Sequence, residues 1–181
     1  MSVRHRVFIS YHHALDQVYK DRFYTLFHQH AEAMVDQSVW DGDIDPNVST
    51  ETARRTIRDR YLRDTTVTVV LVGRETWQRK HVDWEIGSSL RDTQYNPRSG
   101  LLGILLPTYQ MLRGNQYDAH TIPPRLWDNI QGGFASIHPW SDSVANVQGW
   151  IHEAFIRRRT HLPVNSRTHF ARNRAGERWG D

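Results

Sequence analysis

The sequence predicts an α/β fold: a doubly wound, five-stranded parallel sheet in the order 2-1-3-4-5, with helices on both faces. Short apolar runs such as the one from Thr66 to Val72 are rich in β-branched residues, which is typical of strands buried on both faces. Segments with apolar residues at helical spacing separate these runs. The alternation repeats about five times, and short right-handed crossovers favour this strand order.

The N-terminal part is expected to hold the first two strands and the first helix. Residues 4–10 contain Val-Phe-Ile in succession and predict a strand, and residues 11–15 predict a polar loop. Helical spacing begins at Asp16, an N-cap or first-turn acid, and continues to Met34. Residues 37–40 are the candidate second strand.

The central part is expected to hold one helix, the most apolar strand and a second helix. A turn-rich loop leads to a helix capped by Ser49 or Thr50 and ending near Arg63. The strand over 66–72 follows, and the next helix begins at about His81. Its apolar stripe consists of Val82, Ile86 and Leu90.

The C-terminal part is expected to add two strands and one helix. Residues 101–106 predict a buried strand, and residues 134–138 predict a last short one. Between them, residues 108–133 are interpreted as a long irregular segment with a functional or covering role. Ser141 is expected to cap a final helix. The buried stripe of that helix consists of Val144, Val147, Ile151 and Phe155.

Length and charge favour one domain over residues 1–160 and a basic tail over 161–181. The 181 residues suffice for one sizeable core, and the absence of cysteine excludes disulfides and thiolate chemistry. From Arg157 to Asp181 there are seven arginines against two acids, so the net charge of +3 belongs to this end. We expect a solvated tail, no nucleic-acid or membrane partner, and a cytoplasmic location.

The predicted strand order brings two distant stretches to one crevice. In open α/β sheets ligands bind at the carboxyl ends of strands where the order reverses, here between strands one and three. The residues from Gly73 to Glu85 follow strand three on one side of this crevice, and Glu85 lies at the edge of a helix's apolar stripe. The residues from Ser10 to Asp16 approach from the other side, and the loop of Trp40 lies alongside.

Three stretches of the chain resemble Toll/interleukin-1 receptor (TIR) domains. VFISYHHALD resembles the first conserved box, a strand followed by an acid, here Asp16. WDGDIDPNVSTETARRTIRD is similar to the loop and helix after the second strand, and TVTVVLVGRETWQRKHVDWEI to the segment that carries the glutamate of NAD-consuming members. The resemblance covers about residues 4–107. It is strongest to the TIR-like family that includes the NAD-consuming subunit of Thoeris anti-phage systems, with a flavodoxin-like strand order.

The resemblance implies an enzyme, an NAD+ nucleosidase or ADP-ribosyl cyclase. Glu85 would be the catalytic residue, and Ser10, Tyr11 and His12 would form the loop over the nucleotide. NAD+ would be the substrate, with no further cofactor. The product, ADP-ribose or a cyclic ADP-ribose, would signal to a separate effector in antiviral defence, and the enzyme would act as a homo-oligomer.

The chemistry of the residues agrees with that reading but leaves alternatives open. A carboxylate stabilises the cation that forms when nicotinamide leaves the ribose, and Tyr11, Trp40 or Trp84 would stack on a ring. Each aromatic residue also suits packing, Ser10 and Asp16 suit turn or cap roles, and Glu85 suits a solvated helix edge. No metal is expected at the adjacent histidines. The alternative function is a non-catalytic TIR-like interaction module.

Overall fold

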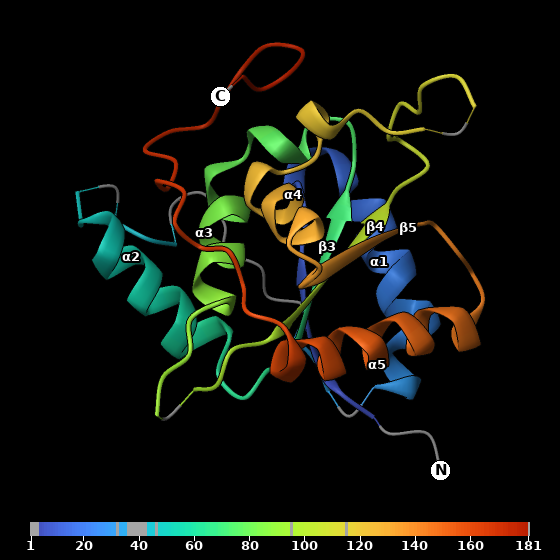
Figure 1. Ribbon diagram of the computed structural model, residues 1–181, viewed down its shortest axis with the longest axis horizontal. Coiled ribbons are helices and arrows are strands. Elements are labelled where there is room, and N and C mark those ends of the chain that lie inside the picture. The colour runs from blue at the N-terminus through green and yellow to red at the C-terminus, as the bar shows by residue number, and fades with distance from the viewer. Residues whose placement is uncertain are drawn as a thin grey trace.

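The computed structural model describes residues 4–31, 33–35, 43–45, 47–94, 96–114 and 116–180 and shows an α/β fold (Figure 1). One parallel sheet has five strands in the order β2-β1-β3-β4-β5. The predicted class, a parallel sheet with helices, is therefore confirmed, and β1 and β3 are neighbours. The strands are β1 Arg6–Ser10, β2 Ala33–Val35, β3 Val67–Val72, β4 Gly100–Leu105 and β5 Ala135–Pro139.

The second strand begins earlier than the sequence analysis placed it. β2 pairs with β1 through the register Arg6↔Ala33 to Phe8↔Val35, whereas the predicted strand at 37–40 lies outside the described residues. The first helix correspondingly ends at Phe27, before a short 3₁₀ turn. A short apolar run cannot be assigned to helix or strand by spacing alone, which is why Met34 was counted with the helix.

The central strands β3 and β4 explain the most apolar runs of the sequence. All six residues of each strand are buried, and they pair from Val67↔Gly100 to Val72↔Leu105. Strands covered by helices on both faces have no solvated side, so their sequence does not alternate. At Gly100 a Cβ atom would collide with the backbone carbonyl of Ala154, so glycine lets the last helix lie directly on β4.

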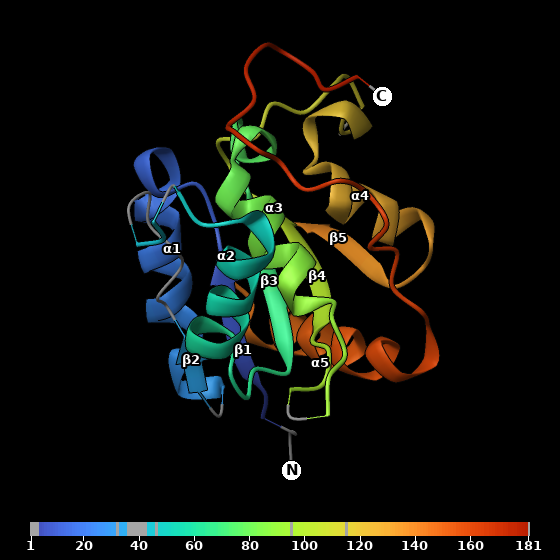
Figure 2. The ribbon, with the colours of Figure 1, turned by 90° about the vertical axis from the view of Figure 1, so that its left-hand side faces the viewer.

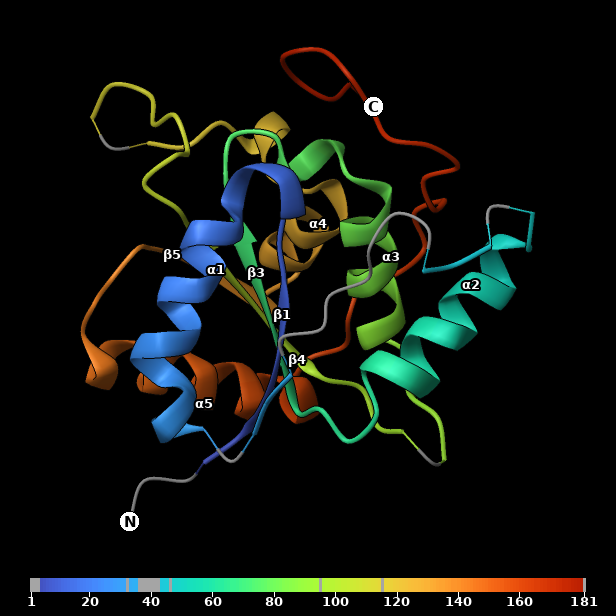
Figure 3. The same ribbon diagram turned by 180° about the vertical axis from the view of Figure 1, so that it is seen from behind.

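Helices cover both faces of the sheet. α1 (His13–Phe27) and α5 (Val144–Thr160) share one core with β1, β3 and β4. α3 (Lys80–Ser89) and α4 (Pro124–Gln131) pack on the other face, and α2 (Thr50–Thr56), followed by a π-helical turn over Ile57–Tyr61, packs beside α3. Figure 2 shows α2 and α3 in front of the strands, and Figure 3 shows α1 and α3 on opposite sides of β1 and β3.

Three local predictions about helix starts are corrected by the structure. α1 begins at His13, so the loop after β1 is two residues long and does not extend over 11–15. The segment 108–133, predicted to be irregular, contains α4, whose first residue is Pro124; proline is favoured there because that amide has no partner inside the helix. The last helix is capped by Ser143, which accepts a hydrogen bond from the Asn146 amide, and not by Ser141. The expected cap of α2 at Ser49 is confirmed.

The C-terminal segment packs against the body of the protein. After α5 the chain runs past α3 and α4, as Figures 1 and 2 show. Phe170 and Trp179 are each only 5% exposed, so the expectation of a solvated tail is wrong. The division into residues 1–160 and 161–181 stays a prediction about folding units.

Across the residues that the structure describes, every helix is too short or too polar to span a lipid bilayer.

Candidate functional site

Glu85 lies at the carboxyl end of β1, buried and hydrogen-bonded. Its side chain comes from the second turn of α3, and Ser10, the last residue of β1, donates its hydroxyl to the Glu85 carboxylate at 2.5 Å. Both residues are 0% exposed. Two residues that are 75 positions apart therefore meet at the carboxyl end of β1, where the strand order predicts that a ligand binds. A solvated helix-edge acid is excluded for this structure.

A second contact joins the residue after Ser10 to the same helix. His81 lies one turn before Glu85, and its Nε2 atom is 3.1 Å from the backbone carbonyl of Tyr11. Because a carbonyl only accepts hydrogen bonds, Nε2 carries the proton in this contact. The imidazole rings of His13 and His81 also stack, with centroids 4.8 Å apart. The last residue of β1 and the residue after it are thus each hydrogen-bonded to α3.

His12 is a buried imidazole with an unused polar atom. It precedes α1 as its N-cap residue but gives no side-chain cap, and it is 5% exposed. Its Nδ1 atom has no hydrogen-bond partner among the described residues. Burial, helped by the positive charge of Arg79, lowers the pKa of His12 from 6.5 to about 4, so the ring is neutral at pH 7. A buried polar atom without a partner marks a position where a ligand group would restore a hydrogen bond.

Asp16 and Tyr11 lie near the same edge but have partners of their own. The Asp16 carboxylate accepts hydrogen bonds from Thr108 at 3.1 Å and from Thr76 at 3.4 Å, and burial raises its pKa. It also fills the space beside Gly73, where a Cβ atom would collide with it. Asp16 therefore braces the loops after β3 and β4 against α1. The Tyr11 hydroxyl donates to Gln17 at 2.6 Å.

The two tryptophans of the predicted site are not brought together. Trp40 lies outside the described residues. Trp84 is half-buried on the side of α3 that faces α2, where it packs on the cluster containing Phe8. Its indole N–H donates to the backbone carbonyl of Phe170 at 2.8 Å. Trp84 is thus engaged in packing with the C-terminal segment, and its role in binding stays a prediction, as do the binding roles of Tyr11 and Asp16.

No group of three or more histidine, aspartate or glutamate side chains within the described parts of the chain is arranged to hold a metal ion.

Sequence reasoning missed Thr108 in this region, and it included Thr76 and His81 only as part of the stretch 73–85, without naming either as a site residue. His81 had a usable signal, because residues four apart share one face of a helix and Glu85 had already been selected. Neither threonine had a signal that would link it to Asp16. They follow β3 and β4, and only the folded sheet brings them to Asp16.

The comparison with known families agrees with the sequence resemblance. The family model described as Thoeris protein ThsB, TIR-like domain, matches residues 8–111. That match begins within β1, at residue 8, and includes α3 and both partners of the Ser10–Glu85 contact; it ends before α4 and the C-terminal segment. The comparison with curated proteins gave no match.

Proposed function

Because the chain belongs to the TIR-like domain family of the Thoeris protein ThsB, we propose that it cleaves NAD+ between nicotinamide and ribose in antiviral defence. The observation that carries the proposal is the buried contact between Ser10 and Glu85 at the carboxyl edge of β1. A carboxylate held away from water interacts more strongly with a developing positive charge than one in solution.

The reaction requires one carboxylate and no general acid. When the bond between nicotinamide and ribose breaks, its electron pair stays on the pyridine nitrogen, so nicotinamide leaves as a neutral molecule. The positive charge passes to the ribose, where the Glu85 carboxylate stabilises it. The Ser10 hydroxyl fixes the orientation of that carboxylate. Attack by water then gives ADP-ribose and a proton, and attack by an oxygen or nitrogen of the same molecule gives a cyclic product.

The burial of the site bears on how activity would be measured. Ser10 and Glu85 are 0% exposed and His12 is 5% exposed, so the substrate reaches them only after local rearrangement. We propose that assembly of several copies provides this rearrangement and that the product acts on a separate effector protein. NAD+ cleavage should therefore be assayed over a range of protein concentrations, and also in extracts of phage-infected cells.

The test is the substitution Glu85→Gln, which keeps the shape of the side chain and removes its charge. We expect nicotinamide release to fall by about 100-fold or more, which corresponds to roughly 3–4 kcal/mol of lost electrostatic stabilisation. The melting temperature should change by only a few degrees, because the amide oxygen of glutamine still accepts the Ser10 hydrogen bond.

The matched control is Glu153→Gln, on the exposed side of α5. This variant should release nicotinamide at the wild-type rate. Retained turnover in Glu85→Gln would show that Glu85 is not the catalytic residue.

The second candidate function is a non-catalytic interaction module. It is favoured by Leu15 and Val18 on α1, which are apolar and 52% and 74% exposed. A wild-type protein that associates in solution but releases no nicotinamide in any of these assays would support this function over the first.

A further inference from the structure

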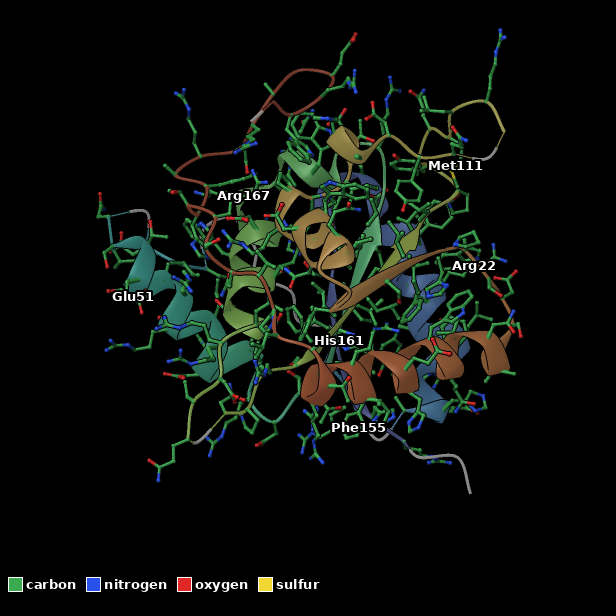
Figure 4. The ribbon with its side chains drawn as sticks, in the orientation of Figure 1. Arg22, Glu51, Met111, Phe155, His161 and Arg167 are labelled. Atoms are coloured by element: carbon green, nitrogen blue, oxygen red, sulfur yellow. The ribbon has the colours of Figure 1, made fainter. Side chains whose placement is uncertain are left out.

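We propose that residues 164–176, here called the strap, hold α3 in the position in which Glu85 can act. This inference rests on the proposed function, because it assigns the strap a role in the same reaction. The strap lies beside α3 and α4, and Arg167 within it is labelled in Figure 4. It does not touch Glu85 in any hydrogen bond that we observe among the described residues, so its residues act by positioning.

The strap contacts α3 at each of its turns. At the first turn, the Asn173 side chain accepts a hydrogen bond from the Lys80 amide at 2.9 Å. At the middle of the helix, the Trp84 indole donates to the Phe170 carbonyl at 2.8 Å. At the last turn, the Asn165 side chain donates to the Gly87 carbonyl at 2.9 Å. These positions recur at intervals of three or four residues and so form one side of the helix.

The side of α3 that meets the strap differs from the side that carries Glu85. His81 and Glu85, four residues apart, face the loop after β1 and contact Tyr11 and Ser10. At about 100° per residue, Lys80, Trp84 and Gly87 are centred roughly 100° or more away from that pair. The strap therefore contacts one side of the helix, and the end of β1 with the loop after it contacts a different side.

A buried ion pair anchors the strap between α3 and α4. Arg125 of α4 donates to the Asp83 carboxylate of α3 at 2.9 Å, and the two side chains are 0% and 3% exposed. The same guanidinium donates to the Asn165 side chain and to the Arg167 carbonyl, both at 2.8 Å. The second carboxylate oxygen of Asp83 accepts the Phe170 amide at 3.0 Å. Atoms of the strap thus supply further hydrogen bonds to both the Arg125 guanidinium and the Asp83 carboxylate.

The absence of a side chain at Gly87 lets the strap approach the helix closely. A Cβ atom at Gly87 would collide with the Nε2 atom of His169. Glycine is disfavoured inside a helix by about 1 kcal/mol relative to alanine, so its presence in the last turn of α3 matches the close approach of the strap.

The test is made in the full-length protein with the double substitution Asn165→Ala and Asn173→Ala. This variant removes the two strap side chains that bond the first and last turns of α3 and leaves every residue near Glu85 unchanged. We expect amide hydrogen exchange to accelerate in residues 80–89. The turnover number for nicotinamide release should fall by about 10- to 100-fold, because a small displacement of a catalytic group costs that much, while KM stays near its wild-type value.

Two further variants separate positioning from a general loss of structure. Asn173→Asp keeps an acceptor for the Lys80 amide and should retain both turnover and slow exchange. Arg22→Ala breaks the exposed ion pair with Asp142, remote from α3, and should change neither measurement.

Faster exchange in α3 with unchanged turnover would overturn the proposal, because the strap would then be only a structural part. Unchanged exchange would overturn it as well. If the wild-type protein releases no nicotinamide, the proposed function fails, and the exchange rates alone decide whether the strap holds α3.

Discussion

At the scale of single residues, the site contains polar atoms that the fold itself does not satisfy. The Nδ1 atoms of His12 and His81 are buried and have no hydrogen-bond partner within the described residues. Leaving such an atom unpaired costs about 1–3 kcal/mol, so proteins rarely retain one without a reason. Both atoms belong to residues beside the Ser10–Glu85 contact, by sequence or by helical spacing. Under the proposed function, these two nitrogen atoms are retained because they form hydrogen bonds with the bound substrate.

The first residue-scale prediction compares His12→Ala with His13→Ala. His12→Ala should lower kcat/KM by about 10- to 100-fold, the loss of one or two hydrogen bonds of about 1–3 kcal/mol to substrate. The melting temperature should hardly change, because the variant also removes an unsatisfied nitrogen. Enzyme kinetics and thermal unfolding measured on the same preparations test both statements.

His13 is the matched control, because its ring packs against other rings of the protein. His13 is the first residue of α1, its ring stacks on His81, and its ring centroid lies 4.6 Å from that of Tyr11. His13→Ala should therefore lower stability more than His12→Ala does. Equal activity losses at equal stability in the two variants would contradict the assignment of His12 to substrate binding.

At the scale of elements, α3 is the helix on which the site depends. Val82, Ile86 and Leu90 pack it on the sheet, His81 and Glu85 contact the loop after β1, and the strap covers a further side. A ten-residue helix is marginal in isolation, so these tertiary contacts and not its propensity determine where it lies. Substitutions on any of these three sides of α3 are therefore expected to change the position of Glu85.

The contact between strap and α3 should weaken in acid because of His169. Burial, with the positive charge of Arg125, lowers the pKa of His169 from 6.5 to about 3. The folded protein thus keeps this ring neutral between those values, whereas the unfolded chain takes up a proton. Stability from this group is complete above about pH 6.5 and is lost as the pH falls towards 3.

We therefore predict that His169→Gln reduces the loss of melting temperature between pH 6.5 and 4. Thermal unfolding at several pH values measures this, with the exposed His161→Gln as the control. His12, whose pKa is lowered to about 4, contributes in the same direction and remains in both variants. A pH profile of His169→Gln that parallels the wild-type profile would show that His169 is protonated without penalty in the folded state.

At the scale of the whole molecule, local spacing was enough to find β1, β3, β4, β5 and the helix that carries Glu85, but it did not find β2, whose Met34 was counted with the first helix. The continuous apolar run of β3 and the stripe Val82, Ile86 and Leu90 report their burial directly, because each pattern depends on neighbours in sequence. Glu85 and Ser10 could be assigned to one crevice because the order of parallel strands fixes which carboxyl ends adjoin.

The parts that were missed depend on contacts between distant residues. Pro123-Pro124 indicates a break in local terms, yet Pro124 begins α4, and the helix is fixed by Leu126 in the core and Arg125 on Asp83. The C-terminal segment after Thr160 has no periodicity, and its few large apolar side chains, Phe170 in the strap and Trp179 beyond it, are surrounded by arginines. Such a segment looks solvated until its partners are known. The helix face that His81 shares with Glu85 can be read from their spacing in the sequence, but His81 was not selected as a site residue.

The final prediction concerns a chain that ends at Thr160. Sequence reasoning expected it to fold, because the tail has few aliphatic residues. In the structure, its removal uncovers the surfaces against which Phe170 and Trp179 pack and leaves the Asp83–Arg125 pair without Asn165 and the Arg167 carbonyl. Losing one buried Phe or Trp costs about 3–5 kcal/mol, and the total stability of a domain is about 5–15 kcal/mol.

We therefore expect the shortened chain to be insoluble or to unfold at much lower urea than the full protein, as followed by circular dichroism. Leu162→Ala in the full chain is the control, since this side chain is 79% exposed and should leave the midpoint unchanged. A shortened chain that unfolds at the same urea concentration as the full protein would mean that the strap contributes no stability and that residues 1–160 fold on their own. Phe170→Ala in the full chain should lie between the two, because it removes one anchor and keeps the hydrogen bonds of the strap backbone.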